Sequence, residues 1–309
     1  MPSRRAFLTT SLGCAYSSLL PAQDAAAAEP IIDIHQHTNY AKRDDATLLL
    51  HQQAMGVTHT ILLPAGTPTE RPSTHNGKSN GLASTCLGNE SCVAIAHQNP
   101  GRYFFAANEV TDLGSAPAEI EKWLKLGAIL IAEQKFDVEC DSPHSQKLYE
   151  LAAEYSVPIL LHFQHERYNR GYDRFHAMLA KFPKTNFIGH AQTFWGNIDK
   201  NHSPTDLYPK GKVTPGGLTD RYLADYPNMF ADMSAGSGLN SLTRDEDHTR
   251  AFLDRHQHKI LYGSDCNDRL GRGPGCQGAQ TIAMLRKLVP NKAAERKILF
   301  ENSKQLFRI

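Results

Sequence analysis

Short apolar segments alternate with amphipathic ones along this chain of 309 residues, and this alternation constrains its fold most. Eight segments read as buried strands, at 31–37, 58–65, 102–110, 128–136, 157–164, 186–192, 229–236 and 259–265. Helices are predicted over 46–57, 91–98, 115–126, 145–155, 172–182, 243–256, 278–288 and 293–306, with one more ending at 226. Strands that alternate with helices pair in parallel, so the pattern predicts an α/β fold, a (β/α)8 barrel.

An open, doubly wound parallel sheet is the alternative architecture. That fold would carry a glycine-rich phosphate-binding turn after its first strand, and the sequence has none there. No break in composition marks a second domain, so residues 29–309 are predicted to form a single domain. The net charge of +1 gives no electrostatic reason to expect binding to nucleic acid or to a membrane surface.

Residues 1–28 read as a targeting segment. Arg4 and Arg5 precede Phe7 and Leu8, an apolar run continues to Leu20, and alanines fill 25–28. The paired arginines resemble a bacterial twin-arginine export signal, which implies a periplasmic or secreted protein. The run is too short and polar to span a bilayer, and a disordered cytoplasmic tail is the alternative.

The first predicted strand, 31–37, ends in two histidines. If side chains alternate along it, Asp33, His35 and His37 share one face, and Ile32, Ile34 and Gln36 share the other. Two imidazoles about 6–7 Å apart along one strand face can converge on a single cation. The competing interpretation is two solvated or hydrogen-bonded histidines at a strand exit.

Other predicted strands also end in polar side chains. They are Glu133 and Lys135, His162 and Gln164, His190 and Gln192, Asp232 and Ser234, and Asp265. A closed barrel gathers the carboxyl ends of its strands around one mouth, so the ends at His162, His190 and Asp265 and the end of the first strand offer histidine or aspartate to one point. Such ligands suit Zn²⁺, and Mn²⁺ or Fe²⁺ with less selectivity. We therefore expect a divalent metal site.

Several motifs recur in a fixed order along the chain: Asp33-Ile34-His35-Gln36-His37, Leu161-His162-Phe163, Ile188-Gly189-His190, Tyr262-Gly263-Ser264-Asp265 and the segment 298–307. Together they resemble the amidohydrolase superfamily, in particular the amidohydrolase-related branch that contains lactone hydrolases and metal-dependent decarboxylases. Each motif alone is weak, but their order and spacing are specific and cover nearly the whole mature chain.

The resemblance implies roles for the strand-end residues. His35, His37, His162 and Asp265 would hold the metal, and His190 would bind a second metal or transfer a proton. A metal-bound water has a pKa near 7, and Asp265 can take its proton while His190 serves the developing oxyanion. The expected activity is hydrolysis of a small-molecule amide, lactone or ester by this metal-activated water at the barrel mouth. A carboxy-lyase of the same superfamily is the runner-up, and an exported non-catalytic binding protein is a third possibility.

The predicted fourth strand departs from the two-metal pattern of the superfamily. Both Glu133 and Lys135 lie on the face of Ile129 and Ile131, so either could act as a bridging group. An ion pair between Glu133 and Lys135 inside the barrel is the alternative. The sequence favours one tightly bound metal, with a second metal bridged by Glu133 as the minority interpretation.

Two long irregular segments, 66–89 and 193–217, are expected to lie over the mouth as lids. Trp195, His202, Tyr208, Gln164 and Gln192 are candidate substrate contacts or supporting residues.

Cysteines and the remaining histidines give weaker signals. Export would permit a Cys86–Cys92 or Cys266–Cys276 bridge, although spacing does not determine pairing, and Cys266 should point away from the metal face. Histidines on helix or linker positions are expected to be solvated: His51, His59, His97, His176 and His256.

Overall fold

The computed structural model describes residues 29–82 and 85–309, and the expected export signal at 1–28 lies outside them. The strands are β1 (Ile32–Gln36), β2 (His59–Leu62), β3 (Tyr103–Phe105), β4 (Ile131–Gln134), β5 (Ile159–His162), β6 (Phe187–His190), β7 (Met229–Asp232) and β8 (Ile260–Leu261). The α-helices are α1 (Asp45–Ala54), α2 (Asn89–Gln98), α3 (Ala116–Lys125), α4 (Pro143–Tyr155), α5 (His176–Lys181), α6 (Ala191–Gly196), α7 (Leu218–Asp225), α8 (Ala235–Thr243), α9 (Glu246–His256), α10 (Gln277–Leu288), α11 (Lys292–Arg296) and α12 (Asn302–Phe307). Short 3-10 turns are η1 (Tyr40–Lys42), η2 (His75–Gly77) and η3 (Tyr172–Arg174), and the π-helical turn η4 (Lys297–Glu301) joins α11 to α12.

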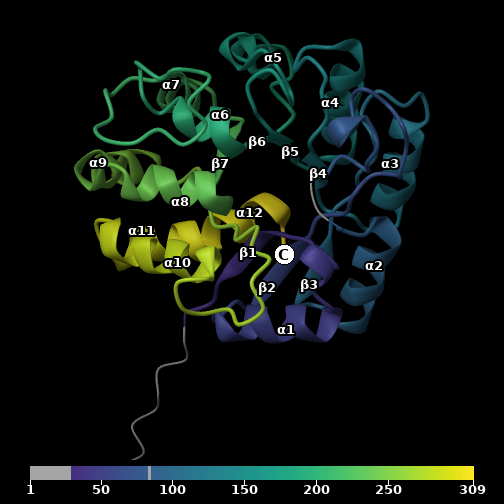
Figure 1. Ribbon diagram of the computed structural model, residues 1–309, viewed down its shortest axis with the longest axis horizontal. Coiled ribbons are helices and arrows are strands. Elements are labelled where there is room, and N and C mark those ends of the chain that lie inside the picture. The colour runs from purple at the N-terminus through teal and green to yellow at the C-terminus, as the bar shows by residue number, and fades with distance from the viewer. Residues whose placement is uncertain (1–28, 83–84) are drawn as a thin grey trace, which may run out of the picture.

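The strands form a closed ring. They pair in parallel in the orders β1-β2-β3 and β4-β5-β6-β7-β8. The backbone N–H of Ala107 donates to Leu130 (2.8 Å) and joins the chain after β3 to β4, and the N–H of Ile34 donates to Tyr262 (3.1 Å) and joins β1 to β8. Helices surround this ring (Figure 1). The predicted (β/α)8 barrel is therefore confirmed.

Apolar side chains fill the ring and separate it from the outer helices. The interior cluster takes members from strands all around the barrel, including Ile34, Ile61, Leu160, Ile188 and Leu261. Phe307 of α12 joins this cluster, and α12 contacts β1 and β8. A larger cluster lies between the strands and the helices around them. With the interior packed, the space for chemistry lies at the rim of the barrel.

Two helices stand where the sequence predicts other structure. The predicted strand 229–236 ends early, and α8 begins at Ala235, ahead of the helix expected from 243. Likewise, α6 begins at Ala191, within the predicted strand 186–192, and continues to Gly196, within the segment predicted to be irregular from 193. The glycines of α8 make its sequence resemble a loop. Close packing requires one of them, because a Cβ on Gly238 would lie 2.5 Å from the carbonyl oxygen of Met233.

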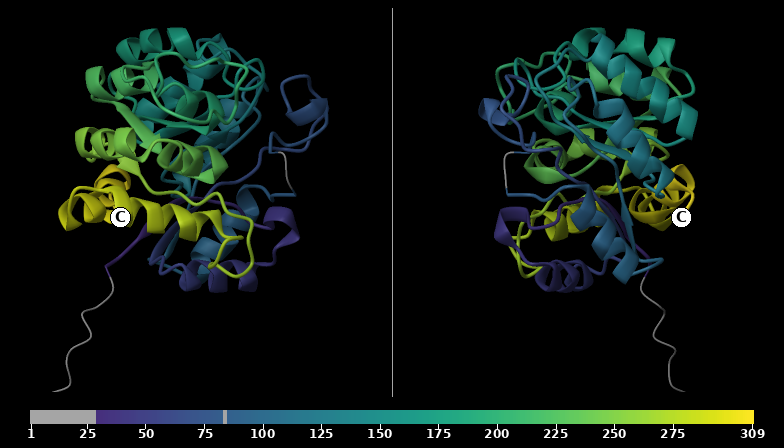
Figure 2. Two further views of the ribbon diagram at one scale, coloured as in Figure 1. Left: turned by 60° about the vertical axis from the view of Figure 1, so that its left-hand side comes forward. Right: turned by 90° about the vertical axis from the view of Figure 1, so that its right-hand side faces the viewer.

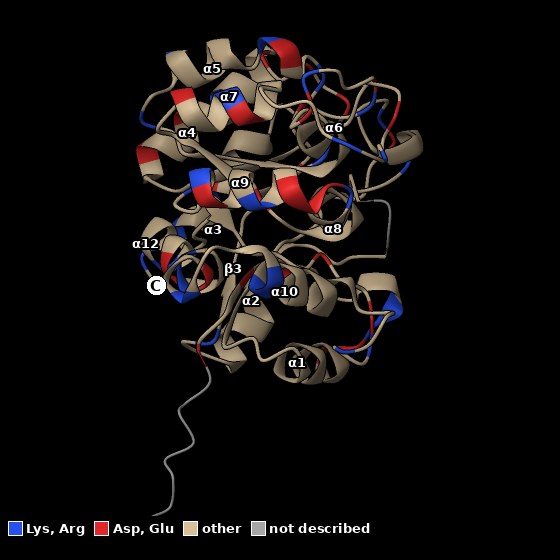
Figure 3. Cartoon of the chain, turned by 90° about the vertical axis from the view of Figure 1, so that its left-hand side faces the viewer, with Lys and Arg blue, Asp and Glu red and all other residues tan. Residues whose placement is uncertain are grey.

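The outer surface carries both signs of charge. Lysines, arginines and acidic residues are interspersed along helices such as α7 and α9 (Figure 3). Within the described residues, no helix is both long and apolar enough to cross a membrane. The segment between β2 and α2, which contains η2, reaches out beyond the strands (Figure 2).

Candidate metal centre

Carboxyl ends of five strands bring together all six residues that the sequence predicts as metal ligands. They are His35, His37, Glu133, His162, His190 and Asp265. The histidines and the glutamate are at most 4% exposed, and the side chain of Asp265 is 14% exposed. The closing of the barrel therefore builds one buried cluster from positions more than 200 residues apart in sequence.

One group of ligand atoms lies at the end of β1. The Nε2 atoms of His35 and His37 lie 3.9 and 3.6 Å from Oδ1 of Asp265, and both lie 3.7 Å from Oε2 of Glu133. Neighbouring ligands of one bound cation are separated by comparable distances. These four residues could therefore hold one divalent cation.

A second group lies across Glu133. Its other carboxylate oxygen, Oε1, lies 2.6 Å from Nδ1 of His162 and 3.7 Å from Nε2 of His190. The three ligand atoms of this group lie within 4.8 Å of one another. Glu133 thus presents one oxygen to each group, and its contact with Nδ1 of His162 is a hydrogen bond.

This arrangement differs from the one the sequence favours. His162 lies with His190 and Glu133, whereas the resemblance placed it with His35, His37 and Asp265 around one metal. Oε1 of Glu133 lies in hydrogen-bond contact with Nδ1 of His162. Burial would raise the pKa of the Glu133 carboxyl, but the charges of Lys135 and His162 outweigh it and lower that pKa, so Glu133 and Lys135 also attract each other.

The expected alternation of faces along β1 is also wrong. Its register against β2 shifts between Asp33 and Gln36, and Ile34 packs into the barrel interior. The Asp33 carboxylate accepts hydrogen bonds from Gln52 of α1 and from Ser264, so it does not join the histidine cluster.

Hydrogen bonds behind the histidines fix the direction of their rings. Nδ1 of His35 lies 2.7 Å from Oδ2 of Asp232, which also lies 3.2 Å from Nδ1 of His190. Ser234 lies 3.0 Å from the same His190 atom, and Nδ1 of His37 lies 2.7 Å from the carbonyl oxygen of Leu63. Nε2 of each of these three rings is left for the ligand groups. The sequence identified Asp232 and Ser234 as strand-end residues but gave them no role.

The pKa shifts of the clustered histidines favour binding of a cation. Burial and the neighbouring His35 lower the pKa of His37 to about 4, and burial and Lys135 lower the pKa of His162 to about 3. Both rings are therefore neutral at physiological pH, the form that binds metal. Burial opposes protonation of His35, but the carboxylates of Asp265 and Asp232 outweigh it and raise its pKa. A divalent cation would compete with that proton for Nε2.

Unpartnered buried atoms support the same conclusion. Nε2 of His35 and Oδ1 of Asp265 are buried and have no hydrogen-bond partner among the described residues. Such atoms cost free energy unless something binds them. The residues present therefore fit a divalent metal ion.

Comparison with known proteins identifies the family of this chain. A family model described as amidohydrolase matches residues 32–309. The chain belongs to the amidohydrolase family. A comparison with curated proteins gave no match for this amidohydrolase.

Solved structures share the barrel of this amidohydrolase. An uncharacterized TIM-barrel protein from Bordetella bronchiseptica is similar at 14% identity and a TM-score of 0.62, covering 90% of this chain and 98% of that one. A 2,6-dihydroxybenzoate decarboxylase from Rhizobium is similar at 15% identity and a TM-score of 0.56, with 91% and 99% covered. A probable 2-pyrone-4,6-dicarboxylic acid hydrolase from Acinetobacter baumannii is similar at 14% identity and a TM-score of 0.56, covering 90% of this chain and 99% of that one. At these identities the similarity shows the fold and leaves the reaction open.

A cavity of about 260 Å³ opens onto the metal cluster of this amidohydrolase. Besides His37, Glu133 and Asp265, it is lined by Tyr40, Leu82, Cys86, Lys135 and Asn267. Two larger cavities, of about 670 and 510 Å³, lie under the long loops and share Gln164 and His165 as lining residues. We take the smaller cavity as the reaction site because the cluster borders it.

The predicted lid residues mostly serve structure. Trp195 is buried at 3% exposure, and its ring N–H donates to the carbonyl oxygen of Asp232. His202 packs against Gly196, where a Cβ would lie 2.3 Å from its ring. Gln192 donates to the hydroxyl of Tyr208, which is 45% exposed. Neither these residues nor Gln164 lines the cavity beside the cluster, whereas Leu82 and Cys86 of the expected lid segment 66–89 do.

Proposed function

We propose that this chain is a metal-dependent hydrolase that cleaves an amide, lactone or ester bond of a small molecule. One observation carries the proposal: the Glu133 carboxylate lies between two groups of buried imidazoles, with the unpartnered Oδ1 of Asp265 facing the first. Nitrogen and oxygen donors of this kind fit Zn²⁺ first, and Mn²⁺ or Fe²⁺ next. His35, His37 and Asp265 would hold one cation, His162 and His190 a second, with Glu133 shared.

The residues at the cavity supply the remaining chemistry. A bound divalent cation would polarise a substrate carbonyl and lower the pKa of water. Asp265 is placed to accept the proton of an attacking water, because Oδ1 is free of other partners among the described residues. The Tyr40 hydroxyl and the Lys135 ammonium line the same cavity and would donate to the oxygen on which negative charge develops.

Metal analysis of purified protein tests the proposal. Protein prepared without added metal should carry divalent cations and should turn over at least one member of a panel of lactones, amides and aromatic acids. His35→Ala should lose both metal and turnover, while His97→Ala, on the exposed face of α2, should keep both. Full turnover by His35→Ala in the presence of a chelator would overturn the proposal.

A carboxy-lyase is the second candidate. The cavity contains the cationic Lys135 beside the metal cluster, which suits a carboxylate substituent on the substrate, and a neighbour in fold is described as a decarboxylase. Isotopically labelled water separates the two reactions: label in the product indicates hydrolysis, and CO₂ release without label in the product indicates a lyase.

We further propose that residues 1–28 direct export by the twin-arginine route, on the basis of Arg4 and Arg5 before Phe7 and Leu8. The full chain should reach the periplasm or the medium. Changing Arg4 and Arg5 to lysine should hold it in the cytoplasm, and an unchanged distribution would refute the route.

A further inference from the structure

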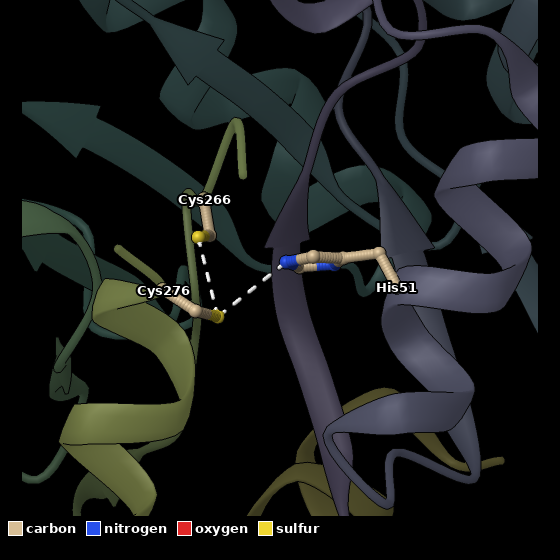
Figure 4. A group of neighbouring side chains, drawn as sticks. All are labelled: His51, Cys266 and Cys276. Carbon is tan, nitrogen blue, oxygen red and sulfur yellow. Dashed lines mark hydrogen bonds between the residues drawn. The ribbon is translucent and has the colours of Figure 1, made fainter. Parts of the chain in front are cut away.

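A second cluster of ligating side chains lies on the far side of the Asp265 backbone. Cys266 follows Asp265 in the loop after β8, Cys276 precedes α10, and His51 comes from α1. All three are buried, at most 1% exposed. Figure 4 shows the two sulfur atoms and the imidazole of His51 facing one another from these three separate segments. Cys266 thus points away from the histidine cluster, as the sequence predicts, but His51 is not solvated.

The distances between these atoms match a metal site. Sγ of Cys276 lies 3.6 Å from Sγ of Cys266 and 3.5 Å from Nε2 of His51. Tetrahedral zinc, with Zn–S bonds of about 2.3 Å and Zn–N bonds of about 2.0 Å, places its donor atoms about 3.5–3.8 Å apart. The two cysteines are free thiols, and their separation exceeds the disulfide bond length of about 2.05 Å. A disulfide would also leave the convergence of His51 unexplained.

A carboxylate lies beside these three ligands. Oδ2 of Asp268, in the same loop as Cys266, lies 3.9 Å from Nε2 of His51 and accepts the backbone N–H groups of Leu270 and Gly271. Nδ1 of His51 is buried and has no hydrogen-bond partner among the described residues.

The surroundings also favour the charges that a zinc site needs. Ala279, in the first turn of α10, donates its backbone N–H to Sγ of Cys276 at 3.4 Å, and a helix N-terminus stabilises a thiolate. The buried guanidinium of Arg43 donates to the carbonyl oxygens of Cys266 (2.9 Å) and Asp268 (2.7 Å). Two thiolates and Asp268 around Zn²⁺ carry a net charge of −1, which Arg43 balances.

We propose that Cys266, Cys276 and His51 hold a structural zinc ion, with the Asp268 carboxylate beside it, at a site separate from the catalytic cluster. The site fastens the loop 265–276 to α1. That loop is already packed closely: a Cβ on Gly271 would lie 2.3 Å from the carbonyl oxygen of His51. Because Cys266 directly follows Asp265, zinc at this site also fixes the backbone that presents the Asp265 carboxylate.

Cobalt spectroscopy tests the site independently of turnover. Co²⁺ bound by thiolates gives a sulfur-to-metal charge-transfer band, which a cluster of imidazoles and carboxylates does not. Reduced full-length protein loaded with Co²⁺ should show the band, and Cys266→Ser and Cys276→Ser should lose it together with about one equivalent of bound metal. His35→Ala should keep the band while losing turnover, so failure of the proposed hydrolase and failure of this site are distinguishable.

Two matched controls identify the sulfurs. Cys140→Ser replaces a thiol that donates to the carbonyl oxygen of Gly171, far along the chain, and should keep the band. Cys86→Ser replaces the thiol that lines the catalytic cavity and should also keep it. Loss of the band in Cys86→Ser alone would overturn the proposal. Absence of the charge-transfer band from reduced wild-type protein would also overturn it, and that measurement does not depend on a variant that folds. A Cys266–Cys276 disulfide, found in protein purified without reductant from the compartment where it resides, would overturn it as well.

Discussion

At the scale of single residues, Glu133 lies between the two groups of imidazoles. The register of β4 against β5 shifts between Ile131 and Gln134, where Glu133 lies, so simple alternation does not place its side chain, yet each of its oxygens faces a different group. Under the proposed function, a carboxylate in this position would offset the charge of two cations and set their separation.

Replacing Glu133 by glutamine keeps the shape and removes the charge. We expect Glu133→Gln to bind less metal and to lose at least about 100-fold in kcat/KM, with an unchanged circular dichroism spectrum. Metal content and turnover of the same preparation provide the measurement. Glu154→Gln, on the exposed face of α4, is the control. A glutamine variant with full metal content and full rate would contradict the bridging role.

The ligands themselves were predictable from sequence because each closes a strand, and parallel strands of a barrel end at one rim. Their supporting partners were not. The contact between His35 and Asp232 joins residues 197 positions apart and depends on how two rings turn inside the closed barrel. Asp33 was predicted on the same face as the histidines by strict alternation, but the register shift in β1 places its side chain elsewhere.

At the scale of elements, hydrogen bonds to the Asp220 carboxylate join α7 to α9. Asp220 accepts hydrogen bonds from Arg255 (3.0 Å) and His256 (2.6 Å), and His256 is only 4% exposed, so the expectation that it is solvated is wrong. Burial would raise the pKa of Asp220, but hydrogen bonds from His256 and Arg255 outweigh it and lower the pKa from 3.8 to about 2.

This lowered pKa ties the stability of the α7–α9 contact to pH. The stabilisation is present in full above about pH 4, where the unfolded carboxylate is ionised, and is lost as pH falls toward 2. Asp220→Asn should lower the free energy of unfolding at neutral pH by about 1–2 kcal/mol, after allowance for solvent screening. The same substitution should also reduce the fall in the free energy of unfolding between pH 4 and pH 2. Urea unfolding across this range is the measurement, with the exposed Asp225→Asn as control; equal slopes for Asp220→Asn and wild type would refute the assignment.

Helix α8 shows why some elements escaped prediction. Its sequence, Ala235 to Thr243, contains two glycines and two further serines or threonines besides Ser237, a composition typical of loops. Tertiary packing overrides this propensity, because Ser237, Gly238, Ser241 and Leu242 are buried and α8 packs against α6 and α10.

At the scale of the whole molecule, the barrel was predictable because eight strand–helix units leave few ways to bury every strand on both faces. If the catalytic centre and the proposed zinc site both hold metal, the stability of the fold depends on the metal that is available. A ligand that binds only the folded state at 100 times its dissociation constant adds about 2.7 kcal/mol of stability per site.

Chelation should therefore lower the thermal unfolding midpoint of wild-type protein, and added Zn²⁺ should restore it. The double variant His35→Ala with Cys276→Ser lacks ligands at both sites and should respond weakly to either treatment. Differential scanning calorimetry with and without chelator gives the comparison. A midpoint that chelation leaves unchanged in wild type would argue against both sites at once.

The seam of the barrel sets an order of events during synthesis. The first strand supplies His35 and His37, but their partner Asp265 arrives only with the last, and the backbone N–H of Asp265 donates to the carbonyl oxygen of His35 across that seam (2.8 Å). A nascent polypeptide lacks this carboxylate until residue 265 of the 309 has been translated. Of the two groups of ligand atoms, the one at the end of β1 is therefore the later to be completed, because Glu133, His162 and His190 all precede Asp265 in the chain.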